Sequence, residues 1–174
     1  MADYKVNRFL GGLAFVNVLL LDQLSKFWIT SLLAPGETKA FCPCINFVLV
    51  FNKGISFGLL NQGKPWQFIV IGMAILLISL WVLRQYWYAE RGAQSFCLGM
   101  ILGGAVGNLL DRVFRSAVVD FIDLYVENFS LPFLQQNHWP AFNVADSAIV
   151  VGVFLLFFLY RNKEKKKKGK EPAG

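Results

Sequence analysis

Four long apolar stretches divide the chain, with more polar segments between them. Each holds roughly 20 mostly apolar residues, the length that an α-helix needs to cross the hydrocarbon core of a bilayer. The stretches cover about 9–30, 66–86, 93–112 and 141–160. The pattern therefore predicts a membrane α-helical fold, with four transmembrane helices in one integral membrane domain covering residues 1–174.

The segments between these stretches have their own patterns. Residues 47–51 are rich in strand-forming side chains, and residues 52–54 (Asn-Lys-Gly) have the composition of a turn before a second short run at 55–57. We expect this part of the segment 31–65 to form a small β-sheet lying on the face of the bilayer. The segment 113–140 is expected to form a loop or a short helix.

Composition supports a membrane protein. The chain is 56% hydrophobic with 16% charged residues, against about 25% charged residues in typical soluble domains, and its mean hydropathy is +0.49. Of the net charge of +6, the tail 161–174 carries +5, from seven Lys or Arg and two Glu. A short basic cluster beside a membrane helix is a topology signal and a contact for anionic lipid. We therefore expect no nucleic-acid binding.

The basic residues also predict the orientation. Four helices place both chain ends on one side, and the connection at 84–91 and the tail 161–174 both fall there. Because Lys and Arg accumulate in cytoplasmic segments, this side is predicted to be cytoplasmic. The segments 31–65 and 113–140 then lie on the outer side.

This topology gathers the polar residues near the outer surface. Asp22 lies about 13 residues into the first helix, roughly 20 Å across the bilayer. Asp120 falls in the outer segment, and Asn143 and Asp146 begin the fourth helix from outside. Polar residues at the end of the third helix recur at helical offsets on one face: Asn108, Asp111, Arg112 and Arg115. A merely structural scatter of polar residues would not converge on one level.

Asp120 and Asp146 stand out because neither has a basic residue within one helical turn in the sequence. Two carboxyl groups in a low-dielectric site resist ionising together, so one holds a proton while the other is charged. The charged group can activate water as general base, and the protonated one can polarise a carbonyl. The sequence therefore predicts an aspartic catalytic pair that needs no metal and no cofactor.

The other acids have simpler explanations. Asp22 and Lys26 lie one helical turn apart and are expected to form an ion pair. Asp111 is expected to pair with Arg112 or Arg115 in the same way. Such pairing makes buried charge tolerable, and we favour this structural explanation for both pairs.

Three amides are candidates for supporting roles. Asn143 lies one turn before Asp146 and is placed to orient it by hydrogen bonding. Asn52 and Asn108 are expected to hold the backbone of a substrate.

The sequence has fewer suitable residues for other catalytic mechanisms. The sequence has no HExxH or similar metal-ligand motif, and His138 is the only histidine. A serine–histidine mechanism lacks a G-x-S-x-G elbow. Ser56 or Ser147 would need a base such as Lys26. His138 is expected to be a loop residue near the membrane interface, and the three cysteines are expected to be unpaired.

Five sequence blocks occur in order along about residues 20–150. They are 21–26 (LDQLSK), 52–57 (NKGISF), 103–112 (GGAVGNLLDR), 118–121 (VVDF) and 140–147 (PAFNVADS). Each block alone is a weak signal, but the five together are highly specific. The chain resembles the bacterial lipoprotein signal peptidase family, also called signal peptidase II.

The resemblance implies an inner-membrane aspartic endopeptidase with four transmembrane helices and a small periplasmic sheet. Such enzymes remove signal peptides from prolipoproteins, cutting before a cysteine that carries diacylglyceryl. By motif match, Asp120 and Asp146 are the catalytic pair, near the periplasmic face. The residues that match the family's other motif positions, which support the site or contact substrate, are Asp22, Lys26, Asn52, Gly54, Asn108, Arg112 and Asn143.

The resemblance also implies partners. We expect a lipid-modified prolipoprotein and membrane lipid to bind, and the cyclic peptide antibiotic globomycin to inhibit. The chain is expected to act as a monomer. Residues 128–138 resemble an added loop relative to the family and are expected to help cover the site.

Two other function classes compete with the peptidase. A small transporter or proton-coupled channel would use membrane carboxylates as a relay, but it should have acids strung across the bilayer and an inverted repeat. Here the acids gather at one face and no repeat is found. A membrane adaptor would depend on its basic tail, so deletion of residues 163–174 would destroy its function. The peptidase hypothesis predicts little loss from that deletion.

Overall fold

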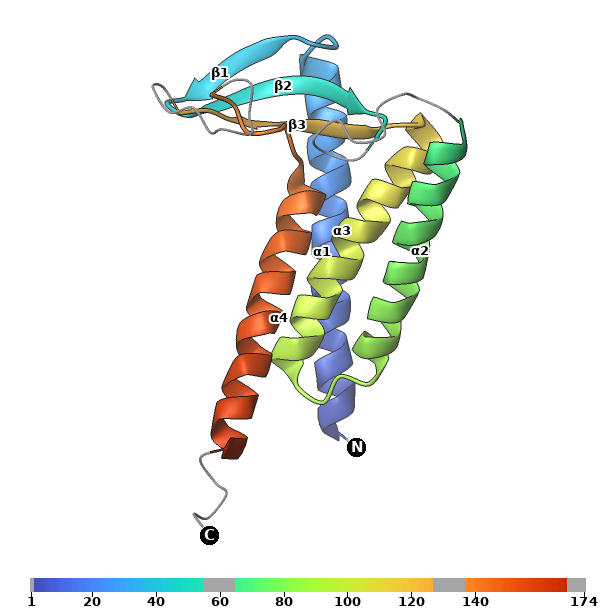
Figure 1. Cartoon of the computed structure of the whole chain (residues 1–174), viewed down its shortest axis with the longest axis vertical. Coiled ribbons are helices and arrows are strands. Elements are labelled where there is room, and N and C mark those ends of the chain that lie inside the picture. The colour runs from blue at the N-terminus through green and yellow to red at the C-terminus, as the bar shows by residue number, and fades with distance from the viewer. Residues whose placement is uncertain (1, 55–64, 127–136, 169–174) are drawn as a thin grey trace.

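Each of the four apolar stretches forms a helix, and a sheet lies across one end of the helices. The computed structural model describes residues 2–54, 65–126 and 137–168. Within them the elements are α1 (Ala2–Leu32), β1 (Thr38–Cys42), β2 (Ile45–Asn52), α2 (Pro65–Trp87), α3 (Gly92–Arg115), β3 (Val118–Leu124) and α4 (Val144–Lys168). Figure 1 shows the helices side by side, with the N-terminus and the end of α4 at the opposite end from the sheet.

The helices have the length and surface of membrane spans. Within the described residues, three are long and apolar enough to cross a bilayer: Val6–Leu32, Gly92–Arg115 and Val144–Arg161. The apolar part of α2 that is described, Gly72–Trp87, is shorter. Large apolar side chains on the helices are exposed in the isolated chain, among them Phe27 and Phe154. Such a surface suits lipid, so the chain is a membrane protein.

The glycines of α3 allow close packing at the centre of the bundle. α3 packs against α1, α2 and α4. A Cβ added at Gly99 would overlap the backbone of Gly11 on α1, and one added at Gly103 would lie 2.8 Å from the carbonyl oxygen of Phe15. Gly104 lies in the same way against the backbone of Ala145 on α4. Small residues therefore bring three helix backbones close together.

The sheet has three antiparallel strands in the order β1-β2-β3. Buried apolar side chains attach it to the end of α1: Ile29, Leu33, Leu49, Val119 and Phe121. In the register of β2 with β3, Val50 pairs with Asp120, and Asn52 pairs with Val118. This pairing brings the last residue of β2 beside Asp120.

The structure confirms the strand predicted at 47–51 and corrects the segment that follows α3. The run expected at 55–57 lies outside the described residues. β3 forms where a loop or a short helix was predicted. Asp120 and Asp123 interrupt its apolar pattern, and aspartate is depleted in strands. Pairing with β2 and burial of Val119 and Phe121 overcome this local preference.

The fourth helix begins later than predicted. α4 begins at Val144, although the apolar stretch starts near residue 141. Phe142 instead forms an antiparallel bridge with Ile122 of β3. This bridge places the start of α4 directly against the strand that carries Asp120.

The packing of α3 on α1 leads to a test of stability. Gly99→Ala is expected to lower the free energy of unfolding by about 1–3 kcal/mol, the usual cost of overpacking. Gly72→Ala is the matched control, because no atom lies within 4 Å of its added Cβ, and alanine favours a helix over glycine. Thermal unfolding of the detergent-solubilised protein measures both. Equal melting temperatures for the two variants would contradict the packing.

Candidate active site

The site is built at the start of α4. Asn143 is the residue before the helix, and Asp146 is its third residue. The Asp146 N–H donates to Oδ1 of Asn143 (2.9 Å), and the Asn143 N–H donates to Oδ2 of Asp146 (3.2 Å). This reciprocal pair has the geometry of a capping box, in which each side chain satisfies a backbone N–H that the helix leaves unpaired.

The same position favours a negative charge on Asp146. Its second oxygen, Oδ1, accepts a hydrogen bond from Nδ2 of Asn108 on α3 at 2.8 Å. Both carboxylate oxygens therefore have donors, and the first turn of a helix attracts negative charge. A carboxylate has about four acceptor positions, so Asp146 can still accept a hydrogen bond from water.

Asp120 reaches the site from β3 in a different environment. Its Oδ2 accepts from Nδ2 of Asn52 (2.9 Å), and its Oδ1 accepts from Nδ2 of Asn143 (2.8 Å). Burial raises the pKa of Asp120 from 3.8 to about 7, and the nearby charge of Asp146 adds to the rise, although the two asparagine hydrogen bonds oppose it. Near neutral pH, Asp120 can therefore carry a proton.

Asn143 and Asn108 connect the two acids. Besides its bond to Asp120, the buried Asn143 Nδ2 lies 3.1 Å from Oδ1 of Asn108 and 3.3 Å from the carbonyl oxygen of Val119. Asn108 in turn donates to Asp146. The orientation of each carboxyl group is therefore coupled to that of the other through two amides.

A fully buried lysine supports this network. The three N–H donors of Lys26 meet Asp22 (2.8 Å), Asp111 (2.8 Å) and Oδ1 of Asn108 (3.0 Å). The other oxygen of Asp22 accepts the backbone N–H of Ala145 at 3.0 Å, so an acid on α1 also caps α4. Lys26 thus balances buried charge and holds Asn108 toward Asp146.

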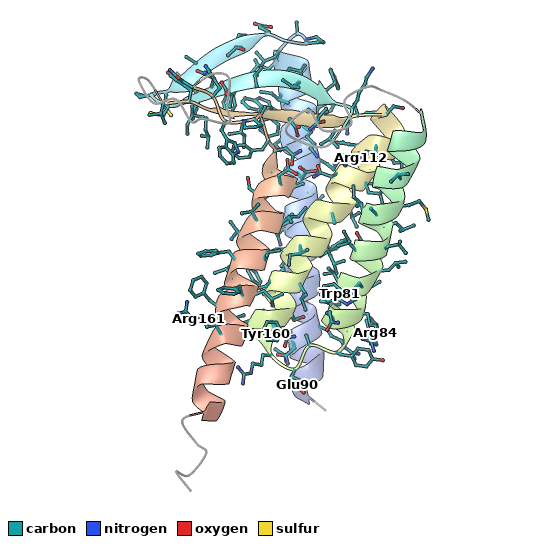
Figure 2. The ribbon with its side chains drawn as sticks, viewed as in Figure 1. Trp81, Arg84, Glu90, Arg112, Tyr160 and Arg161 are labelled. Atoms are coloured by element: carbon teal, nitrogen blue, oxygen red, sulfur yellow. The ribbon has the colours of Figure 1, made fainter. Side chains whose placement is uncertain are left out.

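A cavity of about 460 Å³ opens beside the two acids. Apolar residues of α2, α3 and α4 form much of its wall. Its polar lining includes Asn52, Asn108, Arg112, Asp120 and Asp146, and Gly54 also borders it. Figure 2 shows Arg112 just below the sheet, at the opposite end of the bundle from Arg84 and Arg161.

Arg112 and Gly54 have specific places around this cavity. The Arg112 guanidinium donates to the carbonyl oxygen of Asn108 at 3.1 Å, and its charge acts on both Asp120 and Asp146. The Gly54 N–H donates to Oδ1 of Asn52 at 3.0 Å, which fixes the amide that meets Asp120.

A second cavity, of about 520 Å³, lies along α4. Asp146 borders this cavity as well as the first. Its remaining lining is largely apolar and includes Trp139, Pro140, Ala141 and Phe142. Asp146 is therefore open to two spaces that a large substrate could occupy.

The structure brings all the predicted site residues into one region. It confirms the pairing of Asp22 with Lys26. Asp111 pairs with Lys26 and with Arg115, and of the two arginines expected as its partner only Arg115 forms the ion pair. Lys26 lies 85 positions away in the sequence, so only the packing of α1 on α3 reveals this contact.

Some contacts of the other candidates were not predicted. The Nδ2 groups of Asn52 and Asn108 donate to Asp120 and Asp146, and their expected contact with a substrate backbone stays a prediction. His138, expected to be a loop residue near the membrane interface, has its Nδ1 2.8 Å from Asp123. No local pattern in the sequence indicates this pair, because the two residues lie 15 positions apart in the segment predicted to form a loop or a short helix.

The site residues fall within a region that matches a known protein family. Residues 14–161 match the family described as Signal peptidase (SPase) II. This chain belongs to the signal peptidase II family. The matched region contains every residue of the site, from Asp22 to Asp146.

Curated relatives carry the name lipoprotein signal peptidase. The protein of that name from Polynucleobacter necessarius subsp. necessarius (strain STIR1) is 46% identical over 146 residues, which is 81% of this chain and 82% of that protein. The one from Janthinobacterium sp. (strain Marseille) is 39% identical over 152 residues, covering 84% of each.

A solved structure supports the fold of this signal peptidase II family member. It is described as a bacterial membrane enzyme structure obtained by the in meso method at 2.3 Å resolution. The TM-score is 0.71 at 26% identity, with 94% of this chain and 93% of the other covered. The helices and the small sheet therefore form an architecture already found in a membrane enzyme.

The buried lysine leads to a test of the network. Lys26→Met is expected to lower the free energy of unfolding by about 3–5 kcal/mol, because it leaves buried carboxylates without their cation. Lys39→Ala is the control: it removes an exposed ion pair with Glu37, which is worth less than about 1 kcal/mol. Chemical unfolding in detergent measures both variants. A Lys26→Met protein as stable as Lys39→Ala would contradict the charge-balancing role.

Proposed function

We propose that this protein is a membrane aspartic endopeptidase that removes signal peptides from diacylglyceryl-modified prolipoproteins, cutting before the lipidated cysteine. Membership of the signal peptidase II family supports the removal of prolipoprotein signal peptides. The aspartic mechanism rests on one observation: Asp120 and Asp146 border the same cavity and are joined by the buried Asn143, whose side-chain amide donates to Asp120 and whose backbone N–H donates to Asp146.

The proposed roles follow from the two environments. Asp146 is ionised and takes a proton from water, whose oxygen attacks the scissile carbonyl carbon. Asp120 is protonated and gives its proton to the carbonyl oxygen, which forms a neutral tetrahedral diol. Asp146 then protonates the leaving nitrogen of the lipidated cysteine, and Asp120 recovers a proton from the diol as the C–N bond breaks. Both acids return to their starting states.

Charge balance supports this assignment. Among the described residues, the cations that pair with these acids or border the cavity are Lys26, Arg112 and Arg115. The acids that balance them are Asp22, Asp111 and Asp146. Ionised Asp120 would add a negative charge beyond this balance, which burial makes unfavourable. The pKa of about 7 for Asp120 agrees with a proton held there.

We propose four membrane spans, with α2 as the fourth. Figure 1 shows α2 alongside the other helices over a similar height. Arg84 and Arg161 lie at the end opposite the sheet, so the positive-inside rule assigns that end and both termini to the cytoplasm. The sheet and the two acids then lie at the periplasmic face of a bacterial inner membrane. Action as a monomer and inhibition by globomycin stay predictions.

This placement suits the proposed substrate. A scissile bond at the end of a membrane-embedded signal helix would lie near the outer surface, at the level of the two acids. The apolar walls of both cavities can contact a signal helix or acyl chains, while the polar lining meets the peptide bond. A site below the sheet also limits the access of bulk water.

The pair Asp120 and Asp146, called here the dyad, leads to a direct test. Asp120→Asn and Asp146→Asn are each expected to reduce cleavage by roughly 10²–10⁴-fold or more, because each removes a proton-transfer group. The assay measures cleavage of a diacylglyceryl-modified precursor by mass spectrometry, with the unlipidated precursor as the specificity control. Glu37→Gln makes the same acid-to-amide change at an exposed position and should leave the rate unchanged. Near-normal turnover by either aspartate variant would reject the dyad.

The raised pKa of Asp120 leads to a pH prediction. Because its folded pKa is raised to about 7, the required proton is present below that pH and is lost above it. The value of kcat/KM should therefore fall about tenfold per pH unit above that point. Since the hydrogen bond from Asn52 lowers this pKa, Asn52→Ala should move the fall to higher pH. A kcat/KM that stays constant well above neutral pH would contradict protonated Asp120.

A further inference from the structure

Residues 137–142, called here the return strand, lead directly into α4. They run antiparallel to the end of β3, with bridges at Tyr125–His138 and Ile122–Phe142. The Trp139 N–H donates to the carbonyl oxygen of Leu124 at 2.7 Å. The return strand is thus anchored to the sheet at two places, an outer one near His138 and an inner one at Phe142.

Backbone pairing with β3 does not continue through the middle of the return strand. Between Trp139 and Phe142 lie Pro140 and Ala141, opposite a shorter stretch of β3. Pro140 has no N–H, so it cannot donate to the strand. The backbone pairing is therefore interrupted, and the position of this part depends on the outer anchor.

Side chains strengthen the outer anchor. His138 Nδ1 lies 2.8 Å and 2.9 Å from the two carboxylate oxygens of Asp123 on β3. Asp123 is buried and also accepts from Nδ2 of Asn46 on β2 at 3.0 Å. The His138 ring stacks on Tyr125, with centroids 5.4 Å apart. The Asp123–His138 pair, called here the clasp, therefore ties the return strand to both β3 and β2.

The clasp holds one wall of the second cavity. Trp139, Pro140, Ala141 and Phe142 form that wall, and Asp146 borders the same cavity. The wall lies between the two anchors. Without the outer anchor, the part of the wall nearest Trp139 would no longer be held against β3. A substrate segment beside Asp146 in this cavity would then meet a less ordered surface.

The dyad itself has independent support. Phe142 exchanges two backbone hydrogen bonds with Ile122, of 3.0 Å and 2.8 Å. Beyond it, Asn143 and Asp146 cap one another, and Asn108 holds Asp146. Loss of the clasp should therefore leave the geometry of the reacting groups intact.

We propose that Asp123 and His138 are positioning residues that hold the Trp139–Ala141 wall and so set the affinity for the lipidated precursor. The proposal rests on the proposed function. It assigns to the clasp an effect on substrate binding and none on the chemical step. A charge-assisted hydrogen bond between a buried carboxylate and a partly exposed imidazole is suited to this, because it fixes a surface segment without a large buried core.

The kinetic test compares single and double variants of the full chain. His138→Ala and Asp123→Ala should each raise KM for the diacylglyceryl-modified precursor about tenfold, the usual worth of such a hydrogen bond, with kcat changed little. The double variant should be no worse than Asp123→Ala alone, because that variant already removes the contact with His138. His138→Asn keeps an N–H donor near the Nδ1 position and should restore most of the affinity.

Lys39→Ala is the matched control for this series. It removes an exposed ion pair on β1 of the same sheet and should change neither kcat nor KM. A fall in kcat with unchanged KM, additive effects of the two single variants, or no effect at all would overturn the proposal.

A second readout does not depend on activity. Hydrogen exchange followed by mass spectrometry should show faster exchange of the peptide covering 137–142 in His138→Ala, while peptides from α3 keep their protection. Unchanged exchange at 137–142 would also overturn the proposal. A wild-type protein that left the precursor uncut would reject the proposed function, whereas the exchange would still decide whether the clasp holds the wall.

Discussion

The buried start of α4 imposes the constraint on which the rest of the site depends. A helix start has N–H groups without partners inside the helix, and here buried side chains accept hydrogen bonds from them. Asn143 accepts from one of these groups and Asp22 from another. Asp22 brings a buried negative charge and so requires Lys26, which in turn holds Asn108 toward Asp146. One network of contacts therefore caps α4, balances the buried charge and orients Asp146.

The two acids differ because they come from different elements. Asp146 lies in the first turn of a helix and has donors on both oxygens. Asp120 lies on β3 of the sheet, where burial raises its pKa to about 7. In the proposed mechanism, such unequal environments divide the roles of base and acid between two identical side chains. Membership of the signal peptidase II family favours a peptidase over a transporter or an adaptor. It therefore indicates the reaction in which the two acids would act.

The sequence predicts the helices and the candidate acids, but it has no local signal for contacts that depend on packing. The helices follow from long apolar stretches, and the pairing of Asp22 with Lys26 follows from helical spacing. β3 was missed because its pairing with β2 outweighs the low strand preference of aspartate. The pairing of Lys26 with Asp111 depends on the register of α1 against α3, for which the sequence has no local signal.

In the proposed mechanism, one proton resides on Asp120 while Asp146 is charged. Infrared difference spectroscopy between the wild-type protein and Asp120→Asn detects a protonated carboxyl group directly. We expect a protonated-acid band that is present at pH values below about 7, disappears above it and is absent from Asp120→Asn. A band that survived in Asp120→Asn and disappeared in Asp146→Asn would contradict it.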